Sequence, residues 1–350
     1  MSLVSDLARP EILALKAYSH AAWEPSLQRL HANELPWRID GDASAAGLNR
    51  YPEPQPPPLV QGMARLYDVD PAYVLVGRGS DEAIDLLLRV FCRAGQDRIL
   101  VCPPTYSMYA VAAGIQGAGV VTVPLLADQG FALDVAGVLK RVEPGIKLVF
   151  VCSPNNPTGN AVPRAALLEL ARGLAGRALL VVDEAYAEFM DEASVAPEIP
   201  THSNLVVMRT LSKSHGLAGA RCGALIATPE LIALARKVIP PYAITEMTVE
   251  AVAPMLAPAG IAAMQARVQR LLAERERLRA ALATTPGVQR IWPSDANFLL
   301  VEFADPDTVL QRVRAAGLII RDMRQPALPR ALRISIGTPE QNDILLRSLA

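Results

Sequence analysis

The sequence predicts an α/β fold in which helices flank a mostly parallel sheet. From about Tyr73 onward, short runs rich in β-branched residues alternate with amphipathic segments of helical length. This alternation is typical of parallel strands joined by crossover helices. The chain has 350 residues, which exceeds the roughly 100–200 residues of a usual single domain. Two packed lobes are therefore expected.

Strand candidates recur through the larger predicted lobe. They are Arg98–Cys102, Gly119–Leu125, Lys147–Cys152, Ala178–Asp183, Asn204–Thr210 and Ala220–Ala227. Helical periodicity covers Asp81–Phe91 and Pro163–Leu174 between them. Ahead of these elements, Tyr51–Pro58 holds five prolines in eight positions, which predicts a stiff extended connector.

A long charged helix over about Ile261–Leu282 is predicted to bridge the two lobes, because apolar residues recur on one face at a period near 3.6. The elements expected after it are the strand Phe298–Phe303, the helix Pro306–Ala316, the strands Leu318–Arg321 and Leu332–Ile336, and a last helix. They predict a smaller α+β lobe. We divide the chain into an N-terminal arm with part of the small domain (1–45), a large domain (46–258) and a C-terminal small domain (259–350).

Charge and composition favour a small-molecule ligand. The net charge is −1 and the pI is near 6.5, so no basic field would attract nucleic acid or a membrane surface. Met1–Pro10 lacks the features of a signal peptide. The cysteines show no CxxC spacing, which predicts reduced thiols in a cytoplasmic protein, and the histidines show no metal-ligand spacing.

Asp183 stands at the end of the apolar run ALLVVD, within ALLVVDEAY. Ligand sites of open α/β sheets lie at the carboxyl ends of strands. A carboxylate at a buried strand end needs a partner, and the protonated ring nitrogen of pyridoxal phosphate is one candidate. An exposed acid that caps a helix is the other interpretation of this segment alone.

Lys213, in TLSK, leaves the predicted strand Asn204–Thr210. Desolvation and nearby cations lower the pKa of a lysine enough for it to form an imine with an aldehyde. Ser212 is adjacent, and Arg221 follows eight residues later, so a hydroxyl and a guanidinium can converge on one anion. For either charged residue taken alone, a solvated or surface-paired side chain is the commoner role.

Further polar residues follow other strands. In GRGSDE, Ser80 and Asp81 begin a predicted helix, and helix N-termini bind anions. In CSPNNPTG, Asn156 lies in a rigid turn, and in CPPTYSMY, Tyr106 could stack on a flat ring. An ordinary N-cap, a common turn and a core tyrosine are the alternative roles.

The ordered set NPTG, DEAY and SK, with Arg221 eight residues beyond Lys213, resembles fold-type I pyridoxal-phosphate aminotransferases. More narrowly, HANELPW, NRYPEPQP, CPPTYSMY, CSPNNPTG, RTLSKSHGLAGARCG and LRISIGT resemble the histidinol-phosphate aminotransferase family over nearly the whole chain. The resemblance implies a large domain with a mostly parallel seven-stranded sheet and a smaller α+β domain. It also implies pyridoxal 5′-phosphate as cofactor and a homodimer with shared active sites.

The activity that the resemblance implies is transamination of L-histidinol phosphate with 2-oxoglutarate, giving imidazole acetol phosphate and L-glutamate in histidine biosynthesis. An aromatic amino-acid aminotransferase or a threonine-phosphate decarboxylase on the same scaffold is the alternative. A non-catalytic regulator would not need Lys213, Asp183, Asn156 and Arg221 together, and a nucleotide-binding protein is disfavoured because GxGxxG is lacking.

The resemblance also implies a role for each site residue. Lys213 would bind the cofactor aldehyde and move protons, Asp183 would pair with the ring nitrogen, and Asn156 and Tyr186 would contact the ring 3-oxygen. Tyr106 would stack on the ring. The expected ligands of the cofactor phosphate are Ser80, Asp81, Ser212, Arg221 and, from the second subunit, Tyr51.

Substrate contacts are expected from the arginine of LRISIGT and from four other residues. By resemblance, Arg333 would bind the anionic end of the substrate and Arg321 a phosphate, and bidentate arginine suits both. Tyr18, Asn33 and Glu34 would close over the substrate. The chain departs from the family pattern at Ser214, His215 and Gly216, and at Leu35. These departures bear on the choice of substrate side chain and leave the catalytic groups in place.

Overall fold

A seven-stranded sheet forms the centre of the larger lobe in the computed structural model, which describes residues 2–20, 24 and 27–349. Its strands are β1 (Val74–Gly77), β2 (Arg98–Val101), β3 (Gly119–Thr122), β4 (Ile146–Cys152), β5 (Leu179–Asp183), β6 (Leu205–Thr210) and β7 (Gly223–Ile226). The spatial order is β1-β7-β6-β5-β4-β2-β3, and β7 alone runs antiparallel to its neighbours within the described part of the sheet. The predicted α/β class with a mostly parallel sheet is confirmed.

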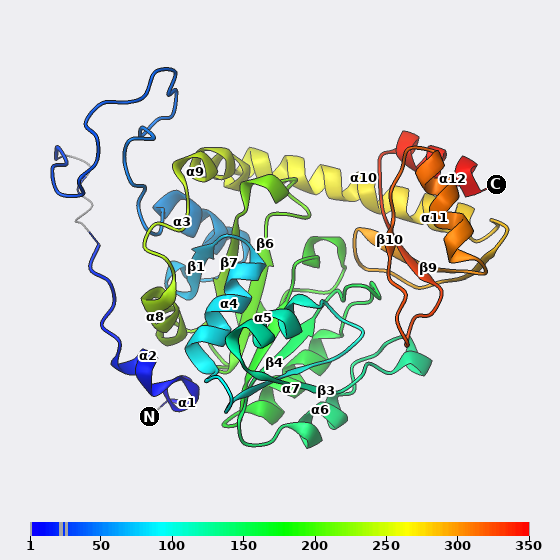
Figure 1. Ribbon diagram of the computed structural model, residues 1–350, viewed down its shortest axis with the longest axis horizontal. Helices are drawn as coiled ribbons and strands as arrows, with labels where there is room; N and C mark the ends of the chain where they lie inside the picture. The colour runs from blue at the N-terminus through cyan, green and yellow to red at the C-terminus, as the bar shows by residue number, and fades with distance from the viewer. Residues whose placement is uncertain (1, 21–23, 25–26, 350) are drawn as a thin grey trace.

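Helices cover both faces of this sheet (Figure 1). In chain order they are α1 (Leu3–Leu7), α2 (Pro10–Ala14), α3 (Pro57–Leu66), α4 (Ser80–Phe91), α5 (Met108–Gln116), α6 (Val135–Arg141), α7 (Arg164–Leu174), α8 (Pro229–Val238) and α9 (Glu246–Val252). Alternate residues of a strand point to opposite faces. Leu180 and Val182 therefore pack with α3, α6 and α7, whereas Leu179 and Val181 pack with α1, α4, α5 and α8.

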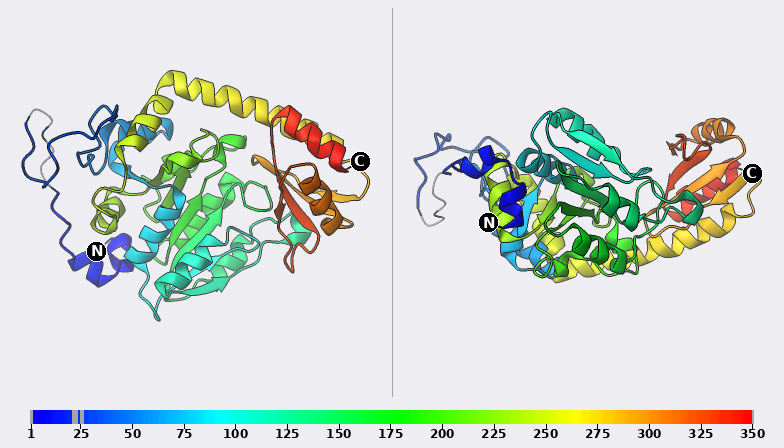
Figure 2. Two further views of the ribbon diagram at one scale, coloured as in Figure 1. Left: turned by 45° about the horizontal axis from the view of Figure 1, so that its top comes forward. Right: turned by 90° about the horizontal axis from the view of Figure 1, so that it is seen from below.

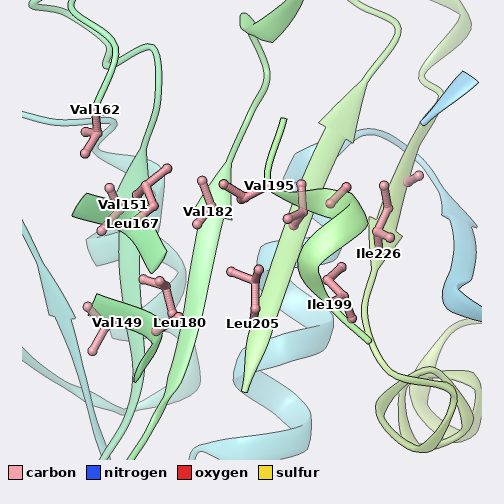
Figure 3. Packing of buried hydrophobic residues seen from close by; sticks show 14 of the residues in the cluster. Val149, Val151, Val162, Leu167, Leu180, Val182, Val195, Ile199, Leu205 and Ile226 are labelled. Atoms are coloured by element: carbon pink, nitrogen blue, oxygen red, sulfur yellow. The ribbon is translucent and has the colours of Figure 1, made fainter. Parts of the chain in front are cut away.

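The face under α3, α6 and α7 is a continuous layer of branched aliphatic side chains. Figure 3 shows Val149, Val182 and Leu205 on neighbouring strands, in one buried cluster with Leu167 of α7. Burying each such side chain contributes about 1.5–3 kcal/mol. A rigid layer of this kind fixes where the carboxyl ends of the strands lie.

The smaller lobe is built on a four-stranded antiparallel sheet within the described residues. Its elements are β8 (Val288–Ile291), β9 (Phe298–Phe303), α11 (Pro306–Ala315), β10 (Arg321–Asp322), β11 (Ala331–Ser335) and α12 (Pro339–Leu349). The strand order is β10-β11-β9-β8. Leu299 and Val301 of β9 pack with Val313 of α11 and Leu345 of α12 in a separate core.

Helix α10 (Pro258–Leu282) runs from the larger lobe to the smaller one, as Figures 1 and 2 show. Its buried residues change partners along its length. Met264 and Val268 pack with Tyr186 and Phe298 between the lobes, whereas Leu278 and Leu282 belong to the core of the smaller lobe. The apolar face predicted for this helix thus packs against both lobes.

Several predicted boundaries were wrong. Pro57 and Pro58 begin α3 rather than ending an extended connector, because proline is favoured in a first helical turn. The strand expected over Leu318–Arg321 is reduced to Arg321–Asp322. The predicted strand Ala220–Ala227 begins only at Gly223, since Arg221 adopts a left-handed conformation at φ 50°.

The predicted domain limits stay a prediction, although two structural observations bear on them. Val4 and Leu7 of the 1–45 arm pack in the core of the larger lobe, and residue 258 lies in the first turn of α10.

Across the described residues, no single helix has the length and apolar composition to cross a bilayer. One bent pair, 246–256 and 258–282 at 76°, passes on length and composition alone.

Candidate active site

A cavity of about 510 Å³ lies at the carboxyl edge of the large sheet and reaches the smaller lobe. Parallel strands β1, β2, β4, β5 and β6 all end at this edge, and each leads directly into residues that line the cavity. The predicted residues brought together here are Ser80, Asp81, Tyr106, Asn156, Asp183, Tyr186, Ser212, Lys213, Arg221, Arg321 and Arg333. Segments far apart in the sequence thus form one site.

One end of the cavity is suited to an anion. Helix α4 begins at Ser80, and its N-cap Gly79 makes no side-chain capping bond, so first-turn N–H groups are available to a ligand. Arg221 Nη1 lies 3.5 Å from Ser212 Oγ, and Arg221 Nη2 lies 3.4 Å from Asp81 Oδ2. A hydroxyl, a guanidinium and a helix N-terminus therefore converge.

Backbone geometry keeps this end open. Gly79 has φ +86°, and a Cβ at this position would lie 3.2 Å from Arg221 Nη2. A Cβ at Gly223 would lie 2.9 Å from the Cα of Gly79. Arg221 itself is in the left-handed region, which non-glycine residues occupy at a cost. The two glycines thus permit the close approach of the α4 N-terminus to the arginine.

Asp81 was predicted as a phosphate ligand, and its side chain is already engaged. Its carboxylate accepts a hydrogen bond from Tyr106 Oη at 3.0 Å and faces Arg221. Because a carboxylate repels a phosphate, any contribution of this residue to anion binding would come from its backbone N–H.

Asp183 is 2% exposed at the end of β5. Its carboxylate accepts hydrogen bonds from Tyr109 Oη at 2.7 Å and from the Ala185 N–H at 3.1 Å. Burial raises the pKa of Asp183 to about 6, although these two hydrogen bonds act to lower it. A cation placed beside this carboxylate would stabilise its ionised form.

Lys213 extends into the cavity from the turn after β6. Its Nζ lies 5.6 Å from the centre of the Tyr186 ring. Partial desolvation lowers the pKa of Lys213, and the positive charge of Arg333 adds to this effect, while Asp81 and Asp183 oppose it. The balance favours a larger fraction of neutral, nucleophilic amine.

Residues of both lobes meet beside Lys213. Asn156 Nδ2 donates to Tyr186 Oη at 3.4 Å, and the Asn156 side-chain oxygen accepts a hydrogen bond from Arg333 of β11. The Tyr186 ring packs edge-on against Phe298 of β9 with centroids 5.3 Å apart. The smaller lobe therefore contributes directly to the wall of the cavity.

Arg321 and Arg333 are opposed across the antiparallel pair β10–β11. Both side chains line the cavity. Like charges directly opposite each other on a sheet are destabilising, so this pairing indicates a site for an anionic group. Bidentate arginines suit carboxylate and phosphate equally.

Four predicted residues, Tyr18, Asn33, Glu34 and Tyr51, do not line the cavity in this chain. The Glu34 carboxylate instead pairs with Arg29 and Arg50 and accepts the Tyr51 N–H at 2.8 Å. The Tyr51 ring stacks on Tyr242 with centroids 4.5 Å apart. Their roles in binding stay predictions.

Tyr109 was missed by sequence reasoning. It lies within the quoted CPPTYSMY, one helical turn beyond Tyr106, and is completely buried. Its ring stacks on Phe150 with centroids 4.8 Å apart, which fixes its hydroxyl toward Asp183. An isolated tyrosine carries no sequence signal for this role. Gln325 and Met323 also line the cavity. They were missed because single residues of these types carry no sequence signal either.

Taken together, the residues present a nucleophilic amine, a buried carboxylate, an anion cradle and the aromatic side chain of Tyr106 in one cavity. This donor set fits a planar heterocycle that carries an aldehyde, a ring nitrogen able to hold a proton, and a phosphate. It offers no comparable set of ligands for a dinucleotide.

Comparison with known proteins identifies the relatives of this chain. The model of the family "Aminotransferase class I and II" matches residues 26–349. A histidinol-phosphate aminotransferase from Stenotrophomonas maltophilia is 47% identical over 98% of this chain and 96% of its own. One from Xylella fastidiosa is 47% identical over 99% and 96%. The solved histidinol-phosphate aminotransferase of Sinorhizobium meliloti, in complex with pyridoxal-5′-phosphate, is 27% identical with a TM-score of 0.79, covering 86% of this chain and 82% of that one.

Burial of Asp183 yields a stability prediction. Its pKa rises from 3.8 to about 6 on folding, so between these values the folded state holds a proton that the unfolded state has lost. Stability therefore falls as pH rises through this window and stays lower above pH 6. In the cofactor-free protein, Asp183→Asn should raise the free energy of unfolding at pH 8 by about 3 kcal/mol, and the gain should shrink toward pH 4.

Urea unfolding at both pH values, at one protein concentration, measures this difference. Asp128→Asn, at an exposed position in the short 3₁₀ helix Ala127–Gln129, is the matched control and should show no such gain. An Asp183→Asn protein less stable than the parent at pH 8 would contradict the electrostatic account.

Proposed function

Because this chain belongs to the class I and II aminotransferase family, we propose that its cavity is the active site of a histidinol-phosphate aminotransferase. The reaction is transfer of an amino group from L-histidinol phosphate to 2-oxoglutarate, in histidine biosynthesis. Near-full-length identity of 47% to proteins of that name supports this assignment. The single structural observation that carries it is the opposed pair Arg321 and Arg333, which the smaller lobe contributes to the cavity wall.

The cofactor is pyridoxal 5′-phosphate. When bound, it supplies an aldehyde for amines and a cationic ring that stores the electron pair released when a Cα–H bond breaks. The residues fit it: Ser80, Ser212 and Arg221 would hold the phosphate, and Asp183 would hold a proton on the ring nitrogen. The open cradle made by Gly79, together with the raised pKa of Asp183 when it lacks a cation, supports this fit.

Lys213 is assigned two tasks in this proposal. Its Nζ would hold the cofactor through the aldehyde when no substrate is bound, and with substrate present the freed amine would accept the proton from the substrate Cα and carry it. Both tasks need a neutral amine, and the lowered pKa of Lys213 favours that form. Asn156 and Tyr186, which contact each other beside it, orient the 3-oxygen of the ring.

Arg321 and Arg333 are assigned to the substrate. The two half-reactions bring a phosphate ester and a dicarboxylate into the same site. Two guanidiniums on adjacent strands can bind either anion with paired hydrogen bonds. Arg333 also donates to Asn156, so substrate binding is linked to the residue that orients the ring.

An aromatic amino-acid aminotransferase is the nearest alternative with the same cofactor. Its substrates carry one carboxylate and an uncharged side chain, and therefore need a single arginine. A threonine-phosphate decarboxylase would also place a phosphate near an arginine. The relatives from Stenotrophomonas maltophilia and Xylella fastidiosa, each 47% identical to this chain, favour neither alternative.

We further propose a homodimer in which Tyr51 reaches the cofactor phosphate of the other subunit. The supporting observation is an exposed apolar arm, residues 13–20 and 27–51, which projects from the larger lobe (Figures 1 and 2). Leu30 is 93% exposed and Trp37 is 72% exposed. Large exposed apolar side chains in one segment indicate a protein interface. A cytoplasmic location stays a prediction from the sequence.

Absorbance spectra test the substrate assignment. We expect the purified protein to show a visible cofactor band that L-histidinol phosphate bleaches at far lower concentration than phenylalanine. The reason is that only the phosphate ester engages both arginines. Arg321→Gln should weaken the response to histidinol phosphate by about 10-fold to 100-fold and leave the weak response to phenylalanine nearly unchanged.

Preferential bleaching by phenylalanine would identify an aromatic aminotransferase instead. Release of carbon dioxide from threonine phosphate would identify the decarboxylase. Absence of a visible band after addition of pyridoxal phosphate would contradict the enzymatic proposal altogether.

Mixed dimers test the shared active site. Lys213→Ala and Tyr51→Ala proteins should each have little activity, because each lacks a group in every site. After unfolding and refolding together, a heterodimer carries both substitutions in one site and neither in the other, so about a quarter of the parental activity should return.

Tyr242→Ala is the control, because it removes the ring on which Tyr51 of the arm stacks and leaves the Tyr51 hydroxyl in place. It should show most of the parental activity by itself. If the mixture of Lys213→Ala and Tyr51→Ala is no more active than the average of its two components, Tyr51 does not act across the interface.

A further inference from the structure

A buried polar cluster lies behind the proposed active site and consists of Tyr67, Glu184, Glu188, Arg209 and His215. Arg209 of β6 is 6% exposed and pairs with Glu184 Oε2 and with Glu188 Oε1, both at 2.6 Å. Its guanidinium carbon also lies 4.6 Å from the centre of the Tyr67 ring. The cluster therefore holds three charges and a phenol away from bulk solvent.

Four side-chain atoms of this cluster are buried without a hydrogen-bond partner among the described protein atoms. They are Tyr67 Oη, Glu188 Oε2, Arg209 Nε and His215 Nε2. Buried polar groups are nearly always satisfied, and a group of several such atoms is typical of a site for ordered water. Tyr67, Arg209 and His215 are each at least nine-tenths buried, so bulk solvent cannot satisfy them.

The cluster residues lie close in the chain to Asp183 and Lys213, the two main residues of the proposed reaction. Glu184 directly follows Asp183 at the end of β5, and Arg209 lies four residues before Lys213 on β6. His215 lies two residues after Lys213, with its ring turned inward, and its Nδ1 lies 2.9 Å from Ser214 Oγ. The turn that carries Lys213 is thus flanked by two buried polar residues, Arg209 before it and His215 after it.

We propose that His215 is a positioning residue for Lys213, and that it acts through one or more ordered water molecules bound between its Nε2 and the unpartnered atoms of Tyr67, Glu188 and Arg209. This inference rests on the proposed function for its kinetic consequence alone. The water site would hold the turn Ser212–Gly216 against β5 and so fix the direction of the Lys213 side chain.

The charges around His215 agree with a neutral ring. Burial lowers the pKa of His215, Arg209 and Arg267 lower it further, and Glu188 acts in the opposite direction. A neutral imidazole has one donor and one acceptor nitrogen. In one tautomer, Nδ1 accepts a hydrogen bond from the Ser214 hydroxyl, and Nε2 donates toward the water and the unpartnered Glu188 oxygen. In the other tautomer, Nδ1 donates to the Ser214 hydroxyl and Nε2 accepts a hydrogen bond from the water.

Histidine NMR tests the site without relying on activity. In the full chain labelled at histidine Cε1, the His215 signal is assigned by its loss in His215→Phe. We expect a neutral ring at pH 6.5, with titration only below that value, in the presence and absence of pyridoxal phosphate. Titration at about 6.5 or above, as for an ordinary histidine, would overturn the proposal.

Kinetics of the holoenzyme test the positioning role. His215→Phe keeps a ring and removes both nitrogens, and we expect kcat to fall about 10-fold to 100-fold with KM changed less than about 2-fold, because Lys213 moves while Arg333 does not. The pH midpoint of the visible cofactor band should shift as well. His215→Gln keeps a polar atom that can reach the water and should recover most of kcat.

His202→Phe is the matched control, since this histidine precedes β6 at the end opposite Lys213, and it should leave kcat and the band midpoint unchanged. Parental values of both quantities in His215→Phe would overturn the proposal. Equal losses in His215→Phe and His215→Gln with an unchanged midpoint would also overturn it, and would show a merely structural residue. If the parent protein has no transaminase activity, the proposed function fails, and the NMR result still decides whether the buried histidine is neutral.

Discussion

A carboxylate buried at the end of β5 is the constraint on which the proposed active site depends. Asp183 is 2% exposed, and burial raises its pKa to about 6 even though Tyr109 donates a 2.7 Å hydrogen bond to it. The fold places this acid at a ligand site because the carboxyl ends of β1, β2, β4, β5 and β6 lie at one edge of the sheet and lead into the cavity. A cationic ring placed there would stabilise the carboxylate and be held protonated by it, which is the electronic requirement of pyridoxal chemistry.

The other groups of the cavity are arranged around this carboxylate by both lobes. The α4 N-terminus, Ser212 and Arg221 form the anion cradle at one end. At the other end, Arg333 of the smaller lobe contacts Asn156, and Phe298 packs on Tyr186. Because α10 packs against both lobes through one buried stripe, the position of the substrate arginines relative to Lys213 depends on that helix.

Much of this site could be predicted from the sequence, for a physical reason. Asp183, Asn156 and Lys213 each follow an apolar run, and parallel strands bring their carboxyl ends together, so motifs far apart in the chain meet. The α4 start at Ser80 was likewise readable from GRGSDE. Residues whose role depends on side-chain packing could not be predicted. Tyr109 is directed at Asp183 by a ring that stacks on Phe150, and the electrostatic surroundings of His215 include Arg209 and Glu188 from other elements. The short strand β8 was missed because its exposed polar residues break the apolar pattern.

Chemical trapping tests the central claim most directly, namely that Lys213 is the amine that binds the cofactor beside Asp183. The protein would be loaded with pyridoxal 5′-phosphate, reduced with borohydride, digested and mapped by mass spectrometry. We expect a phosphopyridoxyl group on Lys213, in the peptide TLSK or its extension, and loss of the label when L-histidinol phosphate is added before reduction. A label on another lysine, or one that histidinol phosphate does not displace, would contradict it.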